Sequence, residues 1–293
     1  MVSEGKMEEK LSLAIQKSGR LSEKSLNLIK ECGIKFSSSG AGRLKTVGTN
    51  FPIEVLFLRD DDIPGYVEDG VAQIGIVGEN VAVEKGKTVE TVKRLGFSRC
   101  RLSLAVPRNV DYPGVAYFNN RNIATSYPKL LGDYLKKEGV NAEIHEISGS
   151  VEIAPSIGLA DGVCDIVSSG STLLSNGLKE VEVIFKSEAV MVGSQYLSPG
   201  QQKLLNELLF RIDAVQKGSG NRYILLNAPN ESIDTIVNLL PGMRSPTVLP
   251  LANKGWSSIH SVVNEDKFWE AIDQLKEAGA EGILVVPIEK MIS

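Results

Sequence analysis

The sequence lacks the features of an exported or membrane-bound protein. Its three cysteines, Cys32, Cys100 and Cys164, stand far apart without a CxxC pair, so we expect a reducing compartment rather than a disulfide framework. The first ten residues mix charges of both signs without an apolar segment, which predicts no secretory signal. No apolar run approaches the roughly 18 residues that a membrane span needs. The sequence therefore predicts a soluble, cytoplasmic protein.

An excess of charge of one sign is also missing, and histidine is scarce. Lys and Arg number 32 and Asp and Glu number 36, a net charge of −4, so no general positive field exists for nucleic acid or an anionic membrane. An anionic ligand must therefore be held locally. The two histidines, His145 and His260, stand far apart without clustered cysteines. We predict no protein-held metal site and no Ser-His-Asp catalytic set.

The sequence does contain a repeated α/β pattern. Short apolar or alternating segments recur at about the spacing of a β-α unit, and most are followed by a helix-like stretch and a glycine. Their order predicts two α/β lobes between which the chain crosses twice, which implies a hinged cleft. The first lobe comprises residues 1–106 plus 186–220, and the second comprises residues 107–185.

A third domain is predicted over residues 222–293. The segment KGSGN at 217–221 has the composition of a linker. The elements expected after it follow the order β-α-β-β-α-β, which is the ferredoxin-like arrangement. Such modules bind regulatory ligands in some proteins and form oligomer interfaces in others, and both interpretations stay open.

The segment DIVSSGSTL at 165–173 gives the strongest chemical signal. An apolar strand opens onto a loop where a helix can begin, and the loop consists of Ser168, Ser169, Gly170, Ser171 and Thr172. Hydroxyls and closely approachable backbone N–H groups at a positive helix end suit a phosphate. Because the loop has neither the GK[ST] of a Walker A motif nor a GxGxxG fingerprint, a polar turn with a capping hydroxyl is the alternative interpretation.

Three further polar positions lie at expected strand or helix ends. The KSGR turn puts Lys17 and Arg20 where open α/β sheets bind ligands, although a solvated basic turn is the alternative. Arg59 and Asp60 begin RDDDIP, which suits either a Mg²⁺-phosphate or ribose contact or a helix N-terminus. Glu152, in a helix expected over 151–159, suits ribose hydroxyls or the helix dipole.

Together these motifs resemble the long form of ATP phosphoribosyltransferase, the first enzyme of histidine biosynthesis. The resemblance extends over essentially the whole chain and rests on several motifs in one order. They are AIQKSGRL (14–21), RDDDIPGYVEDG (59–70), RNIATSYP (121–128), GSVEIAPSIGLAD (149–161), DIVSSGSTLLSNGL (165–178) and ILVVPIEKM (283–291). The resemblance implies two α/β lobes like a type II periplasmic binding protein, followed by a C-terminal ferredoxin-like domain.

The resemblance implies transfer of the 5-phosphoribosyl group of phosphoribosyl pyrophosphate to N1 of ATP, with release of pyrophosphate and with Mg²⁺ as cofactor. Other phosphoribosyltransferases have two adjacent acidic residues in this loop where Ser168 and Ser169 stand here, so we expect substrate oxygens and water to hold most of the Mg²⁺. The implied phosphoribosyl pyrophosphate site comprises Asp165, Ser168, Ser169, Gly170, Ser171 and Thr172. The implied catalytic residues are Lys17, Arg20 and Glu152, and the implied ATP contacts are Arg20, Arg59 and Asp60.

The resemblance also implies a homohexamer in equilibrium with dimers, and feedback inhibition by L-histidine bound to the C-terminal domain. Asn227, Thr247 and Leu251 are the candidate contacts for this inhibitor. The rival interpretation is a catalytically inactive ligand-sensing or regulatory two-lobed binding protein. The missing secretory signal and the missing helix-turn-helix argue against a receptor or a transcriptional sensor, and the intact KSGR and SSGSTL loops argue against an inactive paralogue.

Overall fold

The computed structural model describes residues 9–37, 44–240 and 246–292. Most of the N-terminal segment for which we predicted no secretory signal lies outside the described residues. The chain divides into two compact units. Unit 1 runs to Asn27 and from Ile34 to Leu205, and unit 2 comprises Leu28–Gly33 and the chain from Asn206 onward. The lobe and domain boundaries given above remain predictions.

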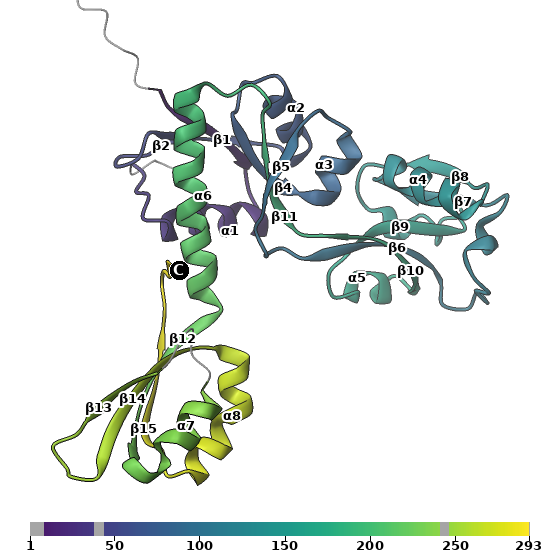
Figure 1. Cartoon of the computed structure of the whole chain (residues 1–293). Coiled ribbons are helices and arrows are strands. Elements are labelled where there is room, and N and C mark those ends of the chain that lie inside the picture. Colours follow the sequence, from purple (N-terminus) through teal and green to yellow (C-terminus); the bar gives the residue numbers. More distant parts are fainter. Residues whose placement is uncertain (1–8, 38–43, 241–245, 293) are drawn as a thin grey trace, which may run out of the picture. The chain divides into compact units, whose positions relative to one another are not determined.

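The first sheet of unit 1 has six strands in the order β2-β3-β1-β4-β11-β5 (Figure 1). β1 is parallel to both β3 and β4, and β11 is antiparallel to both β4 and β5. The strands are β1 (Leu11–Gln16), β2 (Lys45–Val47), β3 (Ile53–Leu58), β4 (Ile74–Gly78), β5 (Glu90–Arg94) and β11 (Ala189–Gly193). The accompanying helices are α1 (Arg20–Glu31), the 3-10 turn η1 (Asp60–Asp62), α2 (Ile63–Glu68) and α3 (Glu79–Lys85).

The second sheet of unit 1 has five strands in the order β10-β6-β9-β7-β8. The chain enters it between β5 and β6 and returns to the first sheet between β10 and β11, which confirms the two crossings predicted for the fold. The strands are β6 (Cys100–Pro107), β7 (Asn122–Thr125), β8 (Glu143–Glu146), β9 (Gly162–Val167) and β10 (Leu178–Ser187). The helical segments are η2 (Val115–Phe118), α4 (Pro128–Glu138), η3 (Val151–Ile153) and α5 (Ser171–Ser175).

The chain from β12 onward forms an antiparallel sheet in the order β13-β14-β12-β15. Its β-α-β-β-α-β order confirms the predicted ferredoxin-like fold, and both main helices cover the same face of the sheet (Figure 1). The long helix α6 (Pro199–Ser219) precedes this domain. The elements of the domain are β12 (Asn221–Pro229), η4 (Asn230–Ser232), α7 (Ile233–Leu239), β13 (Thr247–Pro250), β14 (Trp256–Asn264), α8 (Glu265–Glu277) and β15 (Glu281–Pro287).

Two local expectations were wrong. The helix expected over residues 151–159 is only the short turn η3, followed by hydrogen-bonded turns. Pro155 and Gly158 interrupt this segment, and Gly158 adopts a φ of 76°, which a helix does not allow. The expected linker at 217–221 is ordered: Lys217–Ser219 complete α6, and Gly220 alone separates α6 from β12. Of the helices in the described part of the chain, none combines the length and apolar character of a membrane span.

Gly75 shows how tightly the first sheet packs against α2. A Cβ added there would stand 2.5 Å from Ile63 Cγ2 and 3.1 Å from Val67 Cγ2, both on α2. We expect Gly75→Ala to lower the free energy of unfolding by about 1 to 3 kcal/mol, because a filled core has no room for another carbon. Urea unfolding measures this loss. Gly132→Ala on α4 is the control, because its Cβ would meet only Ile144 Cδ1 at 3.7 Å; equal unfolding midpoints for the two variants would contradict the packing argument.

Candidate active site

The ends of two neighbouring parallel strands carry the basic residues of the site. Gln16 and Leu58, the last residues of β1 and β3, are paired in register, and the backbone N–H of Lys17 donates to the Leu58 carbonyl at 2.7 Å. The register therefore puts Lys17 and Arg59 at the same sheet edge. Arg20 is exposed at the first position of α1. The structure thus brings together the KSGR and RDDDIP motifs, which lie far apart in the sequence.

The serine-rich loop follows β9 and leads into α5. Gly170 has a φ of 83°, a conformation that favours glycine, and Ser169 Oγ lies 3.0 Å from Ser171 Oγ. Residues 166–173 and Arg20 line one cavity of about 270 Å³. Because α5 has only five residues, its dipole contributes little, so the donors available in this cavity are loop N–H groups, hydroxyls and the Arg20 guanidinium.

Two carboxylates, Asp165 just before the loop and Asp60, act by their charge on Tyr127. Burial and the negative charge of Glu152 raise the pKa of the Asp165 carboxyl. Burial and the charges of Asp165 and Asp60 likewise raise the pKa of the Tyr127 hydroxyl, which accepts a hydrogen bond from Asn80 Nδ2 at 3.1 Å. Tyr127 therefore stands within electrostatic reach of carboxylates from both sheets of unit 1. Tyr127 belongs to the motif RNIATSYP, to which no separate role was assigned, and Asn80 was not predicted as a site residue.

The start of α4 is held by a residue from α3. Glu84 accepts hydrogen bonds from the backbone N–H groups of Lys129 and Leu130 at 2.8 and 2.9 Å. Tyr127, the N-cap residue of α4, makes no capping hydrogen bond with its side chain, so Glu84 satisfies N–H groups that a helix N-terminus leaves open. This contact fixes Tyr127 next to Asn80, because Glu84 and Asn80 lie on the same helix.

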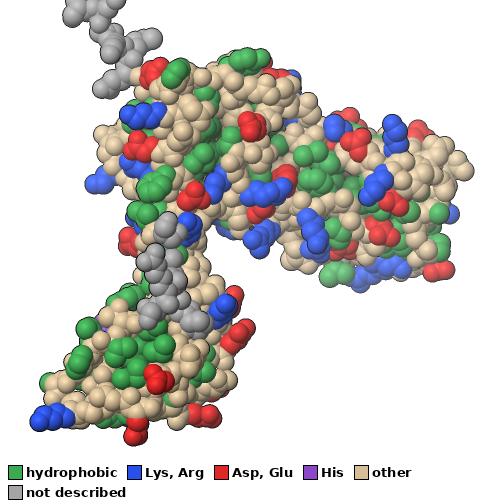
Figure 2. All heavy atoms as spheres, viewed as in Figure 1, with side chains coloured by type: hydrophobic (Ala, Val, Ile, Leu, Met, Phe, Trp, Pro, Cys, Tyr) green, Lys and Arg blue, Asp and Glu red, His purple; other side chains and the backbone are tan. Residues whose placement is uncertain are grey.

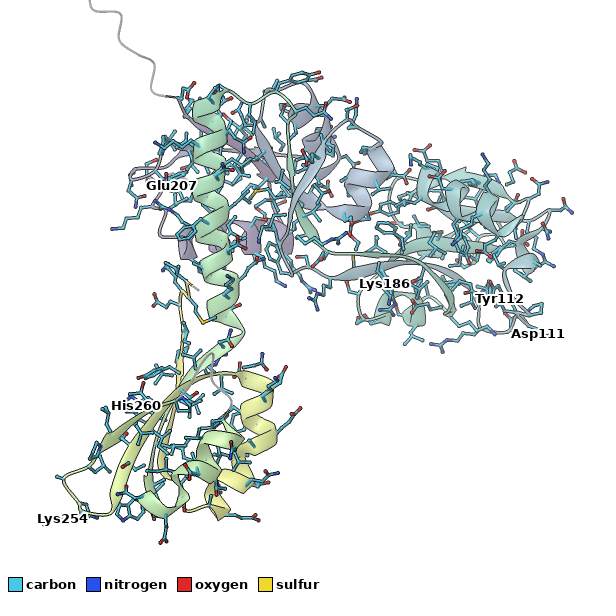
Figure 3. The ribbon with its side chains drawn as sticks, in the orientation of Figure 1. Asp111, Tyr112, Lys186, Glu207, Lys254 and His260 are labelled. Atoms are coloured by element: carbon cyan, nitrogen blue, oxygen red, sulfur yellow. The ribbon has the colours of Figure 1, made fainter. Side chains whose placement is uncertain are left out.

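A second and larger cavity adjoins the serine-rich loop. It measures about 500 Å³ and lies where β5, β6 and β10 meet, and Figure 2 shows Lys and Arg side chains gathered over this part of unit 1. Lys186 points from β10 at this junction (Figure 3). The basic residues of this cavity were not predicted, although the run RCR at 99–101 beside the first crossing was a signal for them. The basic residues that line this larger cavity are Arg94, Arg99, Arg101 and Lys186.

Acidic side chains offset much of this positive charge. Arg94 forms ion pairs with Glu79 and Glu188, and Arg101 forms an ion pair with Glu180. Ser168 lines both cavities, so the loop connects the larger cavity with the smaller one. Among the described residues, no group of three or more His, Cys, Asp or Glu side chains is arranged to hold a metal ion.

The candidate effector residues lie on the C-terminal sheet. Asn227 pairs with Ser258 of β14, and Thr247 of β13 pairs with His260 of β14, so β14 separates the two candidates on one face. Ser258 Oγ lies 3.0 Å from His260 Nε2, and Tyr223 Oη lies 2.7 Å from His260 Nδ1. Figure 3 shows His260 on the side of the sheet away from α7 and α8. Leu251 follows β13, and its N–H donates to the Trp256 carbonyl at 2.9 Å.

Comparisons with known proteins identify one family for nearly the whole chain. The family model described as ATP phosphoribosyltransferase matches residues 59–214, and the model described as HisG, C-terminal domain, matches residues 219–290. Proteins named ATP phosphoribosyltransferase from Cytophaga hutchinsonii and Phocaeicola vulgatus are 64% and 57% identical to this chain over 282 residues. These matches cover 96% of this chain and 98% and 99% of the two relatives.

A solved structure agrees with these relatives. The ATP phosphoribosyl transferase (HisG:HisZ) complex from Thermotoga maritima contains a chain that is 30% identical to this one, with a TM-score of 0.59. The match covers 98% of that chain and 69% of this one. Family models, near full-length relatives and a solved fold therefore lead to one conclusion: this chain belongs to the ATP phosphoribosyltransferase family.

Proposed function

We propose that this chain transfers the 5-phosphoribosyl group of phosphoribosyl pyrophosphate to N1 of ATP, releasing pyrophosphate in the first step of histidine biosynthesis. The observation that carries the proposal is the shared cavity of Arg20 and the serine-rich loop. A phosphate in this cavity would accept from hydroxyls, loop N–H groups and a guanidinium, which together neutralise and orient it. Because both substrates are cytoplasmic metabolites in bacteria, we place the enzyme in the cytoplasm.

The reaction requires positioning more than acid-base chemistry. The bond between the ribose C1 and the pyrophosphate oxygen breaks, and a bond from C1 to N1 of ATP forms, while C1 passes through oxocarbenium character. Catalysis then comes from aligning N1 with C1 and from stabilising the charges that develop on either side of the breaking bond. Asp165 and Glu152 are suited to the ribose hydroxyls and to the positive charge at C1, because they stand close together beside the loop.

Assignment of the remaining residues follows from their positions. The loop residues Ser168 to Thr172 hold the 5-phosphate, in the cavity that Arg20 also lines. Lys17 and Arg59, at the shared edge of β1 and β3, are suited to the pyrophosphate and the ATP phosphates. Asp60 follows Arg59 directly, and its charge acts on Tyr127.

The proposal includes Mg²⁺ as an ion bound to the substrate. We propose that the ion arrives on the pyrophosphate oxygens and keeps most of its water. Asp165, which precedes the loop, and Glu152, whose charge acts on Asp165, are carboxylates that could complete its coordination. Bound there, Mg²⁺ would neutralise charge on the leaving pyrophosphate.

We further propose that the C-terminal sheet binds L-histidine and joins subunits of a homohexamer that dissociates to dimers. Asn227 and Thr247 supply polar groups on a face that neither α7 nor α8 covers. Apolar residues on the same face remain exposed, including Tyr223 at 38%, Leu249 at 49% and Leu284 at 54%. Exposed apolar surface of this kind around a few polar groups favours a subunit interface.

The direct test mixes the purified full chain with ATP, Mg²⁺ and phosphoribosyl pyrophosphate and follows both products. We expect stoichiometric pyrophosphate and phosphoribosyl-ATP, identified by mass spectrometry and separated from ATP by chromatography. Omission of either substrate is the control. Binding of both substrates without product would contradict the proposal and favour the inactive binding protein.

Arg20→Lys tests the guanidinium in the loop cavity. The variant keeps the positive charge but loses the planar fork that grips phosphate through two parallel N–H groups. We expect kcat/KM for phosphoribosyl pyrophosphate to fall at least several-fold, while the melting temperature stays unchanged because Arg20 is exposed. Steady-state kinetics and thermal unfolding measure the two effects. A parallel loss of melting temperature and activity would show that Arg20 acts on the fold instead.

A further inference from the structure

Arg101 of β6 stands between the serine-rich loop and β10. It pairs in register with Val167, the residue immediately before the loop, and β10 borders β6 on its other side. The guanidinium therefore lies over a central strand, with the loop on one side and Glu180 of β10 on the other. Its side chain is 33% exposed and that of Glu180 is 25% exposed, so water reaches the pair only in part.

Each nitrogen of the Arg101 guanidinium has a protein acceptor. Nε and Nη2 donate to the two carboxylate oxygens of Glu180 at 2.5 and 2.6 Å, and Nη1 donates to the backbone carbonyl of Ser168 at 3.1 Å. Ser103 Oγ donates to Glu180 Oε1 at 2.7 Å. Hydrogen bonds from Arg101 and Ser103 also lower the pKa of Glu180, so the carboxylate stays charged at neutral pH. The fork is thus fixed in one plane by Glu180.

The bond to Ser168 affects the loop through peptide geometry. The Ser168 carbonyl and the Ser169 N–H belong to one planar trans peptide, and the two groups point in opposite directions. Holding the carbonyl on Arg101 therefore turns the Ser169 N–H away from Arg101. This N–H belongs to the loop whose residues line the smaller cavity.

We propose that Arg101, held by Glu180, is a positioning residue that sets the orientation of the Ser168–Ser169 peptide and so shapes the phosphate loop. The proposal rests on the function proposed above, and it gives Arg101 no contact with substrate, because all three guanidinium nitrogens already donate to Glu180 or Ser168. Arg101 thus connects the basic lining of the larger cavity to the backbone of the loop that lines the smaller one.

Two variants in the full chain separate positioning from direct contact. Arg101→Lys keeps the charge but replaces three donor nitrogens in a planar fork by a single ammonium nitrogen, so it cannot reproduce the geometry that joins Glu180 to the Ser168 carbonyl. Glu180→Gln leaves the arginine intact but replaces one of the two carboxylate oxygens that accept from it by an amide NH2 group. We expect both to raise KM for phosphoribosyl pyrophosphate roughly 5- to 30-fold, as for a hydrogen bond of modest strength, with KM for ATP within about twofold of wild type. In the double variant, KM for phosphoribosyl pyrophosphate should rise by less than the product of the two single increases, because the two residues act as one unit.

Calorimetry with ribose 5-phosphate gives a readout that does not depend on turnover. We expect both variants to weaken its binding by a similar factor. Arg222→Lys is the matched control, because Arg222 forms an ion pair with Glu265 within unit 2, and this change should leave both KM values unaltered. If Arg101→Lys fails to fold, Glu180→Gln carries the test.

The outcomes separate the two proposals. An unchanged or lower KM in Glu180→Gln, with a raised KM in Arg101→Lys, would overturn the positioning role in favour of direct contact with substrate. Equal increases in the KM values for both substrates, together with a lower melting temperature, would overturn it in favour of a purely structural role. A wild-type chain without phosphoribosyl transfer would contradict the proposed function, and ribose 5-phosphate binding would then still report on the loop.

Discussion

Replacing Thr172 with alanine is expected to lower kcat/KM for phosphoribosyl pyrophosphate by roughly 10- to 150-fold. Thr172 is exposed at the start of α5 and lines the loop cavity with Arg20, so its hydroxyl is available to a phosphate. One hydrogen bond to a charged group contributes about 1.5 to 3 kcal/mol, which converts to this range. The lost interaction concerns only one substrate, so KM for ATP should change much less.

Steady-state kinetics with each substrate varied in turn provides the measurement. Thr235→Ala makes the same chemical change at an exposed position of α7 and should leave both parameters unaltered. Unchanged kinetics in Thr172→Ala would remove the loop from the phosphate site. A loss confined to ATP would instead reassign the loop to the nucleotide.

Saturation with L-histidine should lower the activity of the full chain about 5- to 150-fold. This range corresponds to a coupling free energy of about 1 to 3 kcal/mol, which is typical between two distinct sites. Thr247→Ala and Asn227→Ala should each weaken the inhibition, because both residues offer polar groups on the uncovered face of the C-terminal sheet. Basal activity without L-histidine should remain in both variants.

Calorimetry with L-histidine on the full chain tests the contacts directly. Truncation is a poorer test, because a cut after Gln216 would fall within α6 and remove its last turn. Thr235→Ala, at an exposed position of α7 on the opposite side of the sheet from Asn227 and Thr247, serves as the control. Heat of binding equal to wild type in both Thr247→Ala and Asn227→Ala would refute these contacts, and inhibition that persists in both would locate the effector elsewhere.

The elements of regular periodicity were predictable from the sequence alone. The strand at 11–16, the serine-rich loop and the C-terminal β-α-β-β-α-β order each depend on local patterns, namely alternation, small polar residues and turn signals. Regions with conflicting local signals were harder to predict from the sequence. Residues 151–159 are apolar enough for a helix, yet Pro155 and Gly158 prevent one, while Gly218 and Gly220 suggested a linker although α6 continues to Ser219.

Contacts between distant segments left no signal in a single sequence. Nothing local to Arg101 specifies Glu180 as its partner, because their pairing depends on β6 and β10 lying side by side. Asn80 and Tyr127 likewise meet only through folding of α3 against α4. The shared cavity of Arg20 and the serine-rich loop was expected in general terms, since strand ends gather ligand-binding residues, but its lining required the structure.

The short step from α6 to β12 limits where this chain can change in length. Only Gly220 separates the two elements, so the strand leaves the helix at a fixed angle around the helix axis. Each residue of an α-helix turns the chain by about 100° and advances it by about 1.5 Å, so inserting or deleting one residue in the last turn of α6 would rotate the start of β12 by that amount. The hairpin tip at Lys254 has no such restriction, because it ends in solvent between β13 and β14 (Figure 3). Insertions and deletions among relatives should therefore concentrate at the hairpin tip and spare the helix-to-strand step.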